Sequence, residues 1–175
     1  MTLGMAETVY TVYPAGYAVL AREKGMELIL WRHAEAEDGM PDDDRPLTAK
    51  GEKHAGKMAD FLRDRIPHDT RILVSPTKRT QQTAHALTKH FITEPEVAAS
   101  ASPEAILKAA DWPDGEGYVL IVGHQPALGE VAALLLSGRQ DYWSIKKGAV
   151  WWLSRRTHEG DYQTSLRLVI APDHL

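Results

Sequence analysis

Five side chains suited to binding or transferring a phosphoryl group follow short apolar segments of the sequence. They are Arg32, His33, Lys78, Arg79 and His124. A guanidinium group stays charged at every relevant pH, and its fork of N–H groups matches the oxygens of a phosphate. An imidazole can act as a nucleophile or carry a proton near neutral pH. If the fold brings these groups together, they form one positively charged pocket for a phosphoryl group.

The segments that precede these residues are predicted to be parallel strands. Leu28 to Trp31, Ile72 to Val74 and Val119 to Val122 are short, nearly continuous apolar runs. Such runs are typical of central strands that are covered on both faces. Because ligands of open parallel sheets bind beyond the carboxyl ends of the strands, we expect the three segments that carry these residues to converge at one edge.

A helix is predicted after each of these strands. The first begins at the N-cap residue Thr48 and ends before Pro67. The second is predicted to open with Ser75 as its N-cap and Pro76 at its first helical position, and the third opens with Pro126 in the same role. The free N–H groups at such helix N-termini favour an anion.

The remaining segments predict a three-layer α/β/α fold with a mostly parallel central sheet. We expect a weak strand at Glu96 to Ala98, a helix at Pro103 to Ala110, and a terminal hairpin made by Ala149 to Ser154 and Gln163 to Ile170. The segment before Val119 is too short to hold a lid domain.

Residues 26–175 are predicted to form a single domain. Residues 1–25 lack both the basic start and the long apolar stretch of a signal peptide, and they contain Pro14 and several glycines. We expect them to be a flexible extension or a mis-called start, with Met26 as the natural first residue.

The composition excludes several classes of protein. The formal net charge is −4 with both signs interspersed, which argues against a nucleic-acid-binding surface. The chain has no cysteine, so thiolate catalysis and cysteine zinc sites are excluded. No apolar run approaches the roughly 18 residues that a membrane span needs. We therefore expect a cytoplasmic protein with no nucleic-acid or membrane partner.

Four motifs resemble the histidine phosphatase superfamily, whose fold is phosphoglycerate mutase-like. The motifs are Arg32-His33-Ala34, Arg45-Pro46-Leu47-Thr48 followed by Gly51, Ser75-Pro76 followed by Arg79, and Gly123-His124. The second motif is similar to one in the small SixA-type branch of phosphohistidine phosphatases. The resemblance covers Met26 to Pro172, with the motifs in the expected order.

The resemblance implies a phosphatase that needs neither a metal nor a cofactor. His33 is then the nucleophile, and it forms a phosphohistidine intermediate. Arg32 and Arg79 bind the phosphoryl oxygens. His124 forms a hydrogen bond to the transferring group and, if protonated, adds positive charge as the reaction proceeds.

Two features of the site remain open at this point. Arg45 either orders its loop by pairing with Asp42 or Asp44, or it faces the pocket and binds substrate. Many members of the superfamily carry a glutamate as general acid, and the candidates here are Glu35, Asp44 and Glu104.

Two further positions affect the expected geometry. Ala34 replaces the usual glycine, which requires a backbone that avoids positive φ. Lys78 either steers phosphate or faces solvent. The other histidines show no ligand spacing and are predicted at the surface.

The leaving group distinguishes the candidate substrates. Phosphohistidine releases an imidazole that is protonated near neutral pH, whereas a phosphate ester releases a basic alkoxide and benefits from an acid. The lack of a clear acid and of a lid favours phosphohistidine on a signalling or phosphotransfer protein. A phosphatase for small phosphate esters and a non-catalytic phosphate-binding module are the alternatives.

Overall fold

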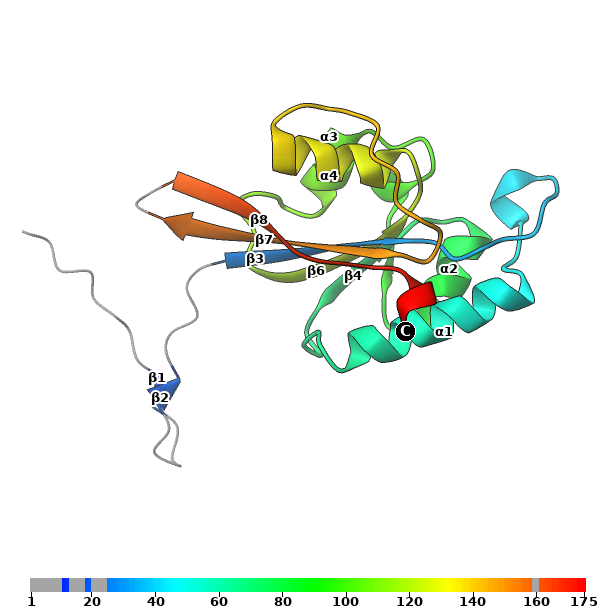
Figure 1. The fold of residues 1–175 in the computed structure, drawn as a ribbon, viewed down its shortest axis with the longest axis horizontal. Helices are drawn as coiled ribbons and strands as arrows, with labels where there is room; N and C mark the ends of the chain where they lie inside the picture. Colours follow the sequence, from blue (N-terminus) through cyan, green and yellow to red (C-terminus); the bar gives the residue numbers. More distant parts are fainter. Residues whose placement is uncertain (1–10, 13–17, 20–24, 159–160) are drawn as a thin grey trace, which may run out of the picture.

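A twisted six-stranded sheet with helices on both faces forms the body of the protein in the computed structural model (Figure 1). The structure describes residues 11–12, 18–19, 25–158 and 161–175. The strands of the sheet are β3 (Gly25–Arg32), β4 (Arg71–Val74), β5 (Ile92–Thr93), β6 (Gly117–Gly123), β7 (Val150–His158) and β8 (Asp161–Ile170). The helices are α1 (Ala49–Arg63), α2 (Lys78–His85), α3 (Pro103–Ala109) and α4 (Ala127–Ser137). Three short 3-10 helices are η1 (Asp42–Asp44), η2 (Pro95–Val97) and η3 (Pro172–His174).

Most of the predicted N-terminal extension, residues 1–25, lies outside the described residues. Within it, β1 (Thr11–Val12) and β2 (Ala18–Val19) pair with each other in antiparallel fashion. Gly25 already belongs to β3, where it pairs with Arg156 of β7.

The strand order β5-β4-β6-β3-β7-β8 confirms a mostly parallel sheet. The first four strands in this order run parallel to one another. Strands β7 and β8 are antiparallel and form the predicted terminal hairpin, although both are longer than the sequence suggested.

The two faces of the sheet are covered by different helices, which confirms the three-layer arrangement. Helices α3 and α4 pack on one face and α1 and α2 on the other (Figure 1). Strand β3 is buried on both sides, because Leu28 and Leu30 belong to one apolar cluster while Ile29 and Trp31 belong to the other. This explains why its sequence is a continuous apolar run rather than an alternating one.

The register of the parallel strands places their carboxyl ends side by side. Arg32, the last residue of β3, pairs with Gly123, the last residue of β6. The next residues continue the alignment, since His33 N–H donates to Gly123 O at 3.1 Å and Ser75 N–H donates to Val122 O at 3.1 Å. The segments after β3, β4 and β6 therefore leave the sheet at one place.

Helix α1 begins as predicted. Thr48 is its N-cap, and the hydroxyl of Thr48 accepts a hydrogen bond from Gly51 N–H at 2.9 Å. The helix ends at Arg63, before Pro67. Among the described residues, no helix is long and apolar enough to cross a membrane.

The predicted start of α2 was wrong. Thr77, not Ser75, is the N-cap residue, and the helix begins at Lys78 rather than at Pro76. Ser75 is fully buried, and its hydroxyl is bonded to the ring of His124 instead of to the helix. Pro126 likewise lies at the N-cap position of α4, one residue before the predicted place.

The predicted strand at Glu96 to Ala98 was also wrong. The strand in this region is β5, which ends at Thr93, and residues Pro95 to Val97 form η2. Pro95 has no N–H to donate to a neighbouring strand and disfavours continued pairing. The predicted helix at Pro103 to Ala110 is confirmed as α3, capped by Ser102.

Glu27 in β3 is a buried carboxylate that the sequence analysis did not single out. It is 3% exposed and accepts hydrogen bonds from Trp152 Nε1 at 2.6 Å, Ser154 Oγ at 3.2 Å and Arg156 Nη2 at 2.6 Å. Arg167 forms an ion pair with it at 3.0 Å. Burial raises the pKa of Glu27, but the hydrogen bonds from Arg156, Trp152 and Arg167 outweigh this effect and hold the pKa below its usual value.

We expect Glu27→Ala to lower the free energy of unfolding by about 2 kcal/mol, because it removes the shared acceptor of two arginines and two neutral donors. Urea denaturation measures the change. Glu37→Ala, at an exposed position in a loop, is the control and is expected to change stability by less than about 0.5 kcal/mol. Equal stability of the two variants would contradict a stabilising role for Glu27.

Candidate active site

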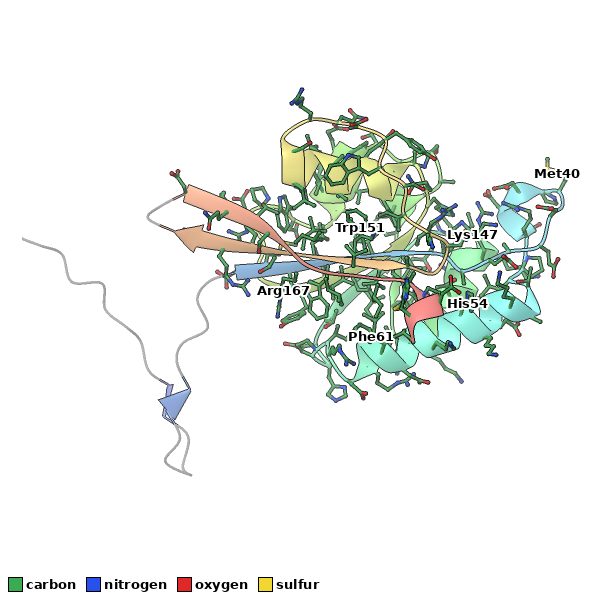
Figure 2. All side chains as sticks on the ribbon, in the orientation of Figure 1. Met40, His54, Phe61, Lys147, Trp151 and Arg167 are labelled. Carbon is green, nitrogen blue, oxygen red and sulfur yellow. The ribbon has the colours of Figure 1, made fainter. Side chains whose placement is uncertain are left out.

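A pocket of about 330 Å³ opens where β3, β4 and β6 end. Its lining residues are Arg32, His33, Ala36, Asp42, Arg45, Arg79, Ala99, His124, Gln125 and Lys147. The four residues proposed from the sequence as the core of the site, Arg32, His33, Arg79 and His124, are thus brought together. Lys147 lies toward the end of the molecule that holds the pocket (Figure 2). Met40, in the loop that carries Asp42, lies toward the same end.

The two histidines face each other inside the pocket. Their ring centroids are 5.2 Å apart with an interplanar angle of 56°. His33 is 7% exposed and His124 is 3% exposed. Both rings are therefore shielded from water, in a pocket that three arginines also line.

Hydrogen bonding defines which nitrogen of His33 is free. Its Nδ1 lies 2.7 Å from Ala34 O. Because a carbonyl oxygen only accepts, Nδ1 carries the proton and Nε2 keeps its lone pair in the neutral ring. Burial, followed by the charges of Arg79 and Arg32, lowers the pKa of His33 to about 4, although the hydrogen bond to Ala34 O acts in the opposite direction. Neutral His33 is therefore the main form near pH 7.

His124 has the opposite arrangement. Its Nδ1 faces Arg79 Nη2 at 3.5 Å, and a guanidinium only donates, so Nδ1 is the acceptor. Its Nε2–H then donates to Ser75 Oγ at 2.7 Å. Burial lowers the pKa of His124 to about 3, with contributions from His33 and Arg79. The protonated form considered from the sequence is disfavoured by this environment.

Thr83 connects the loop after β3 to helix α2. Its hydroxyl accepts from Ala34 N–H at 3.1 Å and donates to Arg79 O at 2.7 Å. Ala34 is fully buried, and it is not among the described non-glycine residues with positive φ. Alanine therefore fits at this position without strain, as the prediction required.

The two arginines are held by backbone oxygens. Arg32 Nη1 donates to Ile145 O at 2.6 Å, and Arg79 Nη1 donates to Asp42 O at 2.6 Å. The Nε atoms of both arginines are buried and have no hydrogen-bond partner within the described part of the chain. These anchors fix the guanidinium planes at the pocket wall.

Gln125 clamps the loop that holds Arg32. Its Nε2 donates to Trp143 O at 2.6 Å, and its Oε1 accepts from Ile145 N–H at 3.4 Å. Ile145 O is the acceptor for Arg32. Gln125, the residue after His124, therefore also helps to position Arg32 through this loop.

Arg45 orders its loop and also lines the pocket, while substrate binding by Arg45 stays a prediction. Its Nε donates to Asp42 Oδ1 at 2.9 Å and its Nη1 donates to Glu37 O at 3.1 Å, which orders the loop. It also lines the pocket. Among the described residues its carboxylate partners are Asp42 and, at 3.7 Å, Asp38, and Asp44 is not one of them.

The three proposed acids do not line the pocket. Glu35 accepts from Thr48 Oγ1 at 3.3 Å and pairs with Lys50 at 3.4 Å, and the hydrogen bond from Lys50 lowers its pKa. Asp44 is exposed in η1, and Glu104 is exposed in the first turn of α3. Their assignment as acids therefore finds no support in the geometry.

The carboxylate that does line the pocket is Asp42, which the sequence analysis considered only as a partner of Arg45. Lys147 and Gln125 also line the pocket and were not singled out. The only sequence signal for Gln125 is that it follows His124 directly. Lys78 is exposed and is not a lining residue, which favours the solvent-facing alternative.

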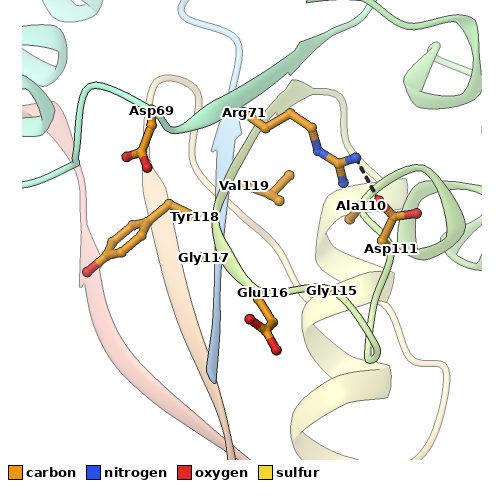
Figure 3. A pocket seen from close by; sticks show the side chains of 9 residues that line it. All are labelled: Asp69, Arg71, Ala110, Asp111, Gly115, Glu116, Gly117, Tyr118 and Val119. Atoms are coloured by element: carbon orange, nitrogen blue, oxygen red, sulfur yellow. Dashed lines mark hydrogen bonds and ion pairs between the residues drawn. The ribbon is translucent and has the colours of Figure 1, made fainter. Parts of the chain in front are cut away.

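A second pocket, of about 290 Å³, lies at the opposite end of the parallel strands, where β4 and β6 begin (Figure 3). Its guanidinium, Arg71, is paired with Asp111 at 2.7 Å, and Asp69 and Glu116 add negative charge. This balance does not suit a phosphoryl group. Among the described residues, no cluster of three histidine, cysteine or carboxylate side chains has a metal-binding arrangement.

Comparisons with known proteins show which proteins the sequence resembles. The profile of the histidine phosphatase superfamily (branch 1) matches residues 28–101. The phosphohistidine phosphatase SixA of Escherichia coli (strain K12) is 30% identical over 123 residues, which are 65% of this chain and 76% of that protein. An uncharacterized protein of Picosynechococcus sp. is 35% identical over 138 residues, which are 71% of this chain and 82% of that protein.

Solved structures share the fold over most of the chain. A SixA structure from Nakamurella multipartitia has a TM-score of 0.68 and 28% identity, and the match covers 85% of this chain and 96% of that one. The protein histidine phosphatase SixA complexed with tungstate has a TM-score of 0.69 and 25% identity, with 85% and 99% covered.

A phosphoglycerate mutase-like fold, with two arginines and two histidines at the strand ends, defines a class of phosphoryl-group enzymes. Together with these similarities, it places the chain in the histidine phosphatase superfamily, to which it belongs. Within the superfamily the protein is a phosphatase of the SixA type.

We expect the ring of His33 to titrate with a midpoint near 4 in the free protein, compared with about 6.5 for an unperturbed histidine. Because its pKa is lowered, the ring is neutral above the midpoint and loses its nucleophilic lone pair only below it. NMR titration of the ring protons, assigned with a His33→Gln variant, measures the value. A midpoint near the ordinary value would show that burial does not control this ring.

We expect Ser75→Ala to lower kcat/KM by about tenfold, because the Nε2–H of His124 loses its close acceptor and the ring is no longer held in place. Steady-state hydrolysis of a phosphohistidine peptide is the measurement. Ser165→Ala, at an exposed position of β8, is the matched control and is expected to be neutral. An unchanged rate for the Ser75 variant would mean that other contacts orient His124.

Proposed function

We propose that the protein is a metal-independent phosphohistidine phosphatase that acts on a signalling or phosphotransfer protein. The observation that carries this proposal is the state of His33, which is buried and neutral with a free Nε2 beside two guanidinium groups. The similarity to phosphohistidine phosphatase SixA of Escherichia coli and to the protein histidine phosphatase SixA supports the substrate class. A cytoplasmic location stays a prediction from the sequence.

The proposed reaction begins with attack by Nε2 of His33 on phosphorus. The new P–N bond forms as the bond from phosphorus to the leaving group breaks, which leaves a phosphohistidine on the protein. Arg32 and Arg79 bind the phosphoryl oxygens and stabilise the charge that spreads over them. The protein histidine phosphatase SixA, a structural relative, was solved in complex with tungstate, a tetrahedral oxyanion, which supports an oxyanion as a ligand of this protein.

In the second step, water attacks the phosphorylated His33 and releases inorganic phosphate. Neutral His124 lies across the pocket from His33 and carries no fixed charge near pH 7, because its pKa is about 3. Its contribution is to accept from Arg79 Nη2 and so help to orient that guanidinium. The permanent positive charge comes from the arginines, which do not depend on pH in the working range.

The leaving group supports phosphohistidine over a phosphate ester. Among the described residues that line the pocket, the one with a carboxylate is Asp42. The hydrogen bond from Arg79 holds the pKa of Asp42 below its usual range. It is therefore ionised and poorly suited to protonate an alkoxide. An imidazole leaving group takes up its proton near neutral pH and does not need such an acid.

The shape of the chain around the site supports a protein substrate. Between β5 and β6 the described chain contains only η2 and α3, so no lid domain is inserted there. A site without a lid admits a side chain presented by a folded protein, whereas small metabolites gain more from closure.

Hydrolysis of a phosphohistidine peptide, compared with p-nitrophenyl phosphate and measured as phosphate release without added metal, tests the proposal. We expect preference for the peptide and a loss of about a thousandfold or more in His33→Ala. His68→Ala, an exposed histidine outside the active-site pocket, is the matched control and is expected to keep full activity.

Two results would replace the proposal with an alternative. Equal or faster ester turnover would indicate a phosphatase for small phosphate esters. Phosphate binding without turnover of either substrate would indicate a non-catalytic phosphate-binding module.

A further inference from the structure

Asp42 already occupies the hydrogen-bonding edge of Arg79. Arg79 donates Nη1 to the backbone oxygen of Asp42 at 2.6 Å and Nη2 to Oδ2 at 2.8 Å. The other carboxylate oxygen, Oδ1, accepts from Arg45 Nε at 2.9 Å. Two of the cations that line the pocket are thus bonded to one carboxylate.

This carboxylate differs from an ordinary surface partner. Arg79 is 3% exposed, so its guanidinium is the buried half of the pair. The side chain of Asp42 is 53% exposed and comes from η1, a short turn in the loop after β3. A phosphoryl group that reaches Arg79 must therefore displace Asp42 or share Arg79 with it.

The backbone oxygen of Asp42 is also bonded to Arg79, so in the shared arrangement the carboxylate stays beside Arg79 and the entering group meets a negative charge at short range. The repulsion grows in proportion to the charge of the entering group, so a dianion is penalised twice as strongly as a monoanion of the same shape. The neutral state of His33 and His124 means that no imidazolium offsets this penalty near pH 7.

We propose that Asp42 sets the charge selectivity of the active site by weakening the binding of dianionic groups relative to monoanionic ones. The biological meaning rests on the proposed function. A phosphohistidine that is protonated on its ring carries about one net negative charge, whereas a phosphate monoester carries about 1.5 to 2 near pH 7. Asp42 thus favours the P–N substrate and the release of product phosphate.

Two tetrahedral oxyanions of similar size and different charge test the selectivity directly. Tungstate carries two negative charges and perrhenate carries one. Calorimetry near neutral pH compares their Kd values for the parent protein and for Asp42→Asn, whose amide oxygen still accepts from Arg79. We expect Asp42→Asn to bind tungstate about tenfold more tightly and perrhenate only about threefold more tightly.

Asp43→Asn is the matched control, because Asp43 lies on the same turn, is exposed, and does not line the pocket. It removes the same charge from the protein and is expected to change neither Kd by more than about twofold. If circular dichroism shows that Asp42→Asn is misfolded, Asp42→Ser replaces it.

Three outcomes overturn the inference. Weaker tungstate binding by Asp42→Asn would mean that Asp42 only positions Arg79. Equal gains for the two anions would mean that charge is not what Asp42 selects. An equal gain in Asp43→Asn would indicate a general field effect of the acidic loop.

Binding is measured without turnover, so this test is separate from that of the proposed function. If Asp42→Asn gains more affinity for tungstate than for perrhenate but the protein does not hydrolyse phosphohistidine, the charge selectivity stands and the proposed function fails. If the protein hydrolyses phosphohistidine but Asp42→Asn shows no such difference, only the role of Asp42 fails.

Discussion

The pairing of buried, neutral imidazoles with permanently charged guanidinium groups is the constraint on which the active site depends. His33 and His124 have pKa values of about 4 and 3, first because they are buried and then because cationic groups and the second ring lie nearby. The arginines supply charge and the histidines supply a lone pair and directed hydrogen bonds. Exposure of the rings to water would remove this separation of roles, because both would then titrate near neutral pH.

The parallel sheet makes this arrangement possible with few specialised contacts. The register that pairs Arg32 with Gly123 also aligns Val74 with Val122, so three chain segments separate from the sheet at the same level. Apolar packing on both faces holds that register, and backbone bonds such as His33 N–H to Gly123 O extend it into the loops. The stability of the core and the geometry of the site thus have the same origin.

The sequence allowed prediction of the layers, the central strands and the four residues that meet in the pocket, because apolar runs and strand-end motifs are local signals. It did not predict the start of α2, because the hydroxyl of Ser75 is hydrogen-bonded to His124, 49 positions away, and does not cap the helix. It also could not select Asp42 from three consecutive aspartates. That choice depends on how η1 turns toward Arg79, which is a tertiary contact without a local pattern.

The clamp made by Gln125 has a consequence for how such a site can vary. Arg32 takes its orientation from Ile145 O, and the loop that bears this oxygen is tied to Gln125 through Trp143 O and Ile145 N–H. Substitutions or length changes in the exposed stretch just before Trp143 can therefore shift a guanidinium by small amounts while every residue in contact with the anion stays the same. Evolution or engineering can use this remote loop to adjust affinity in fine steps.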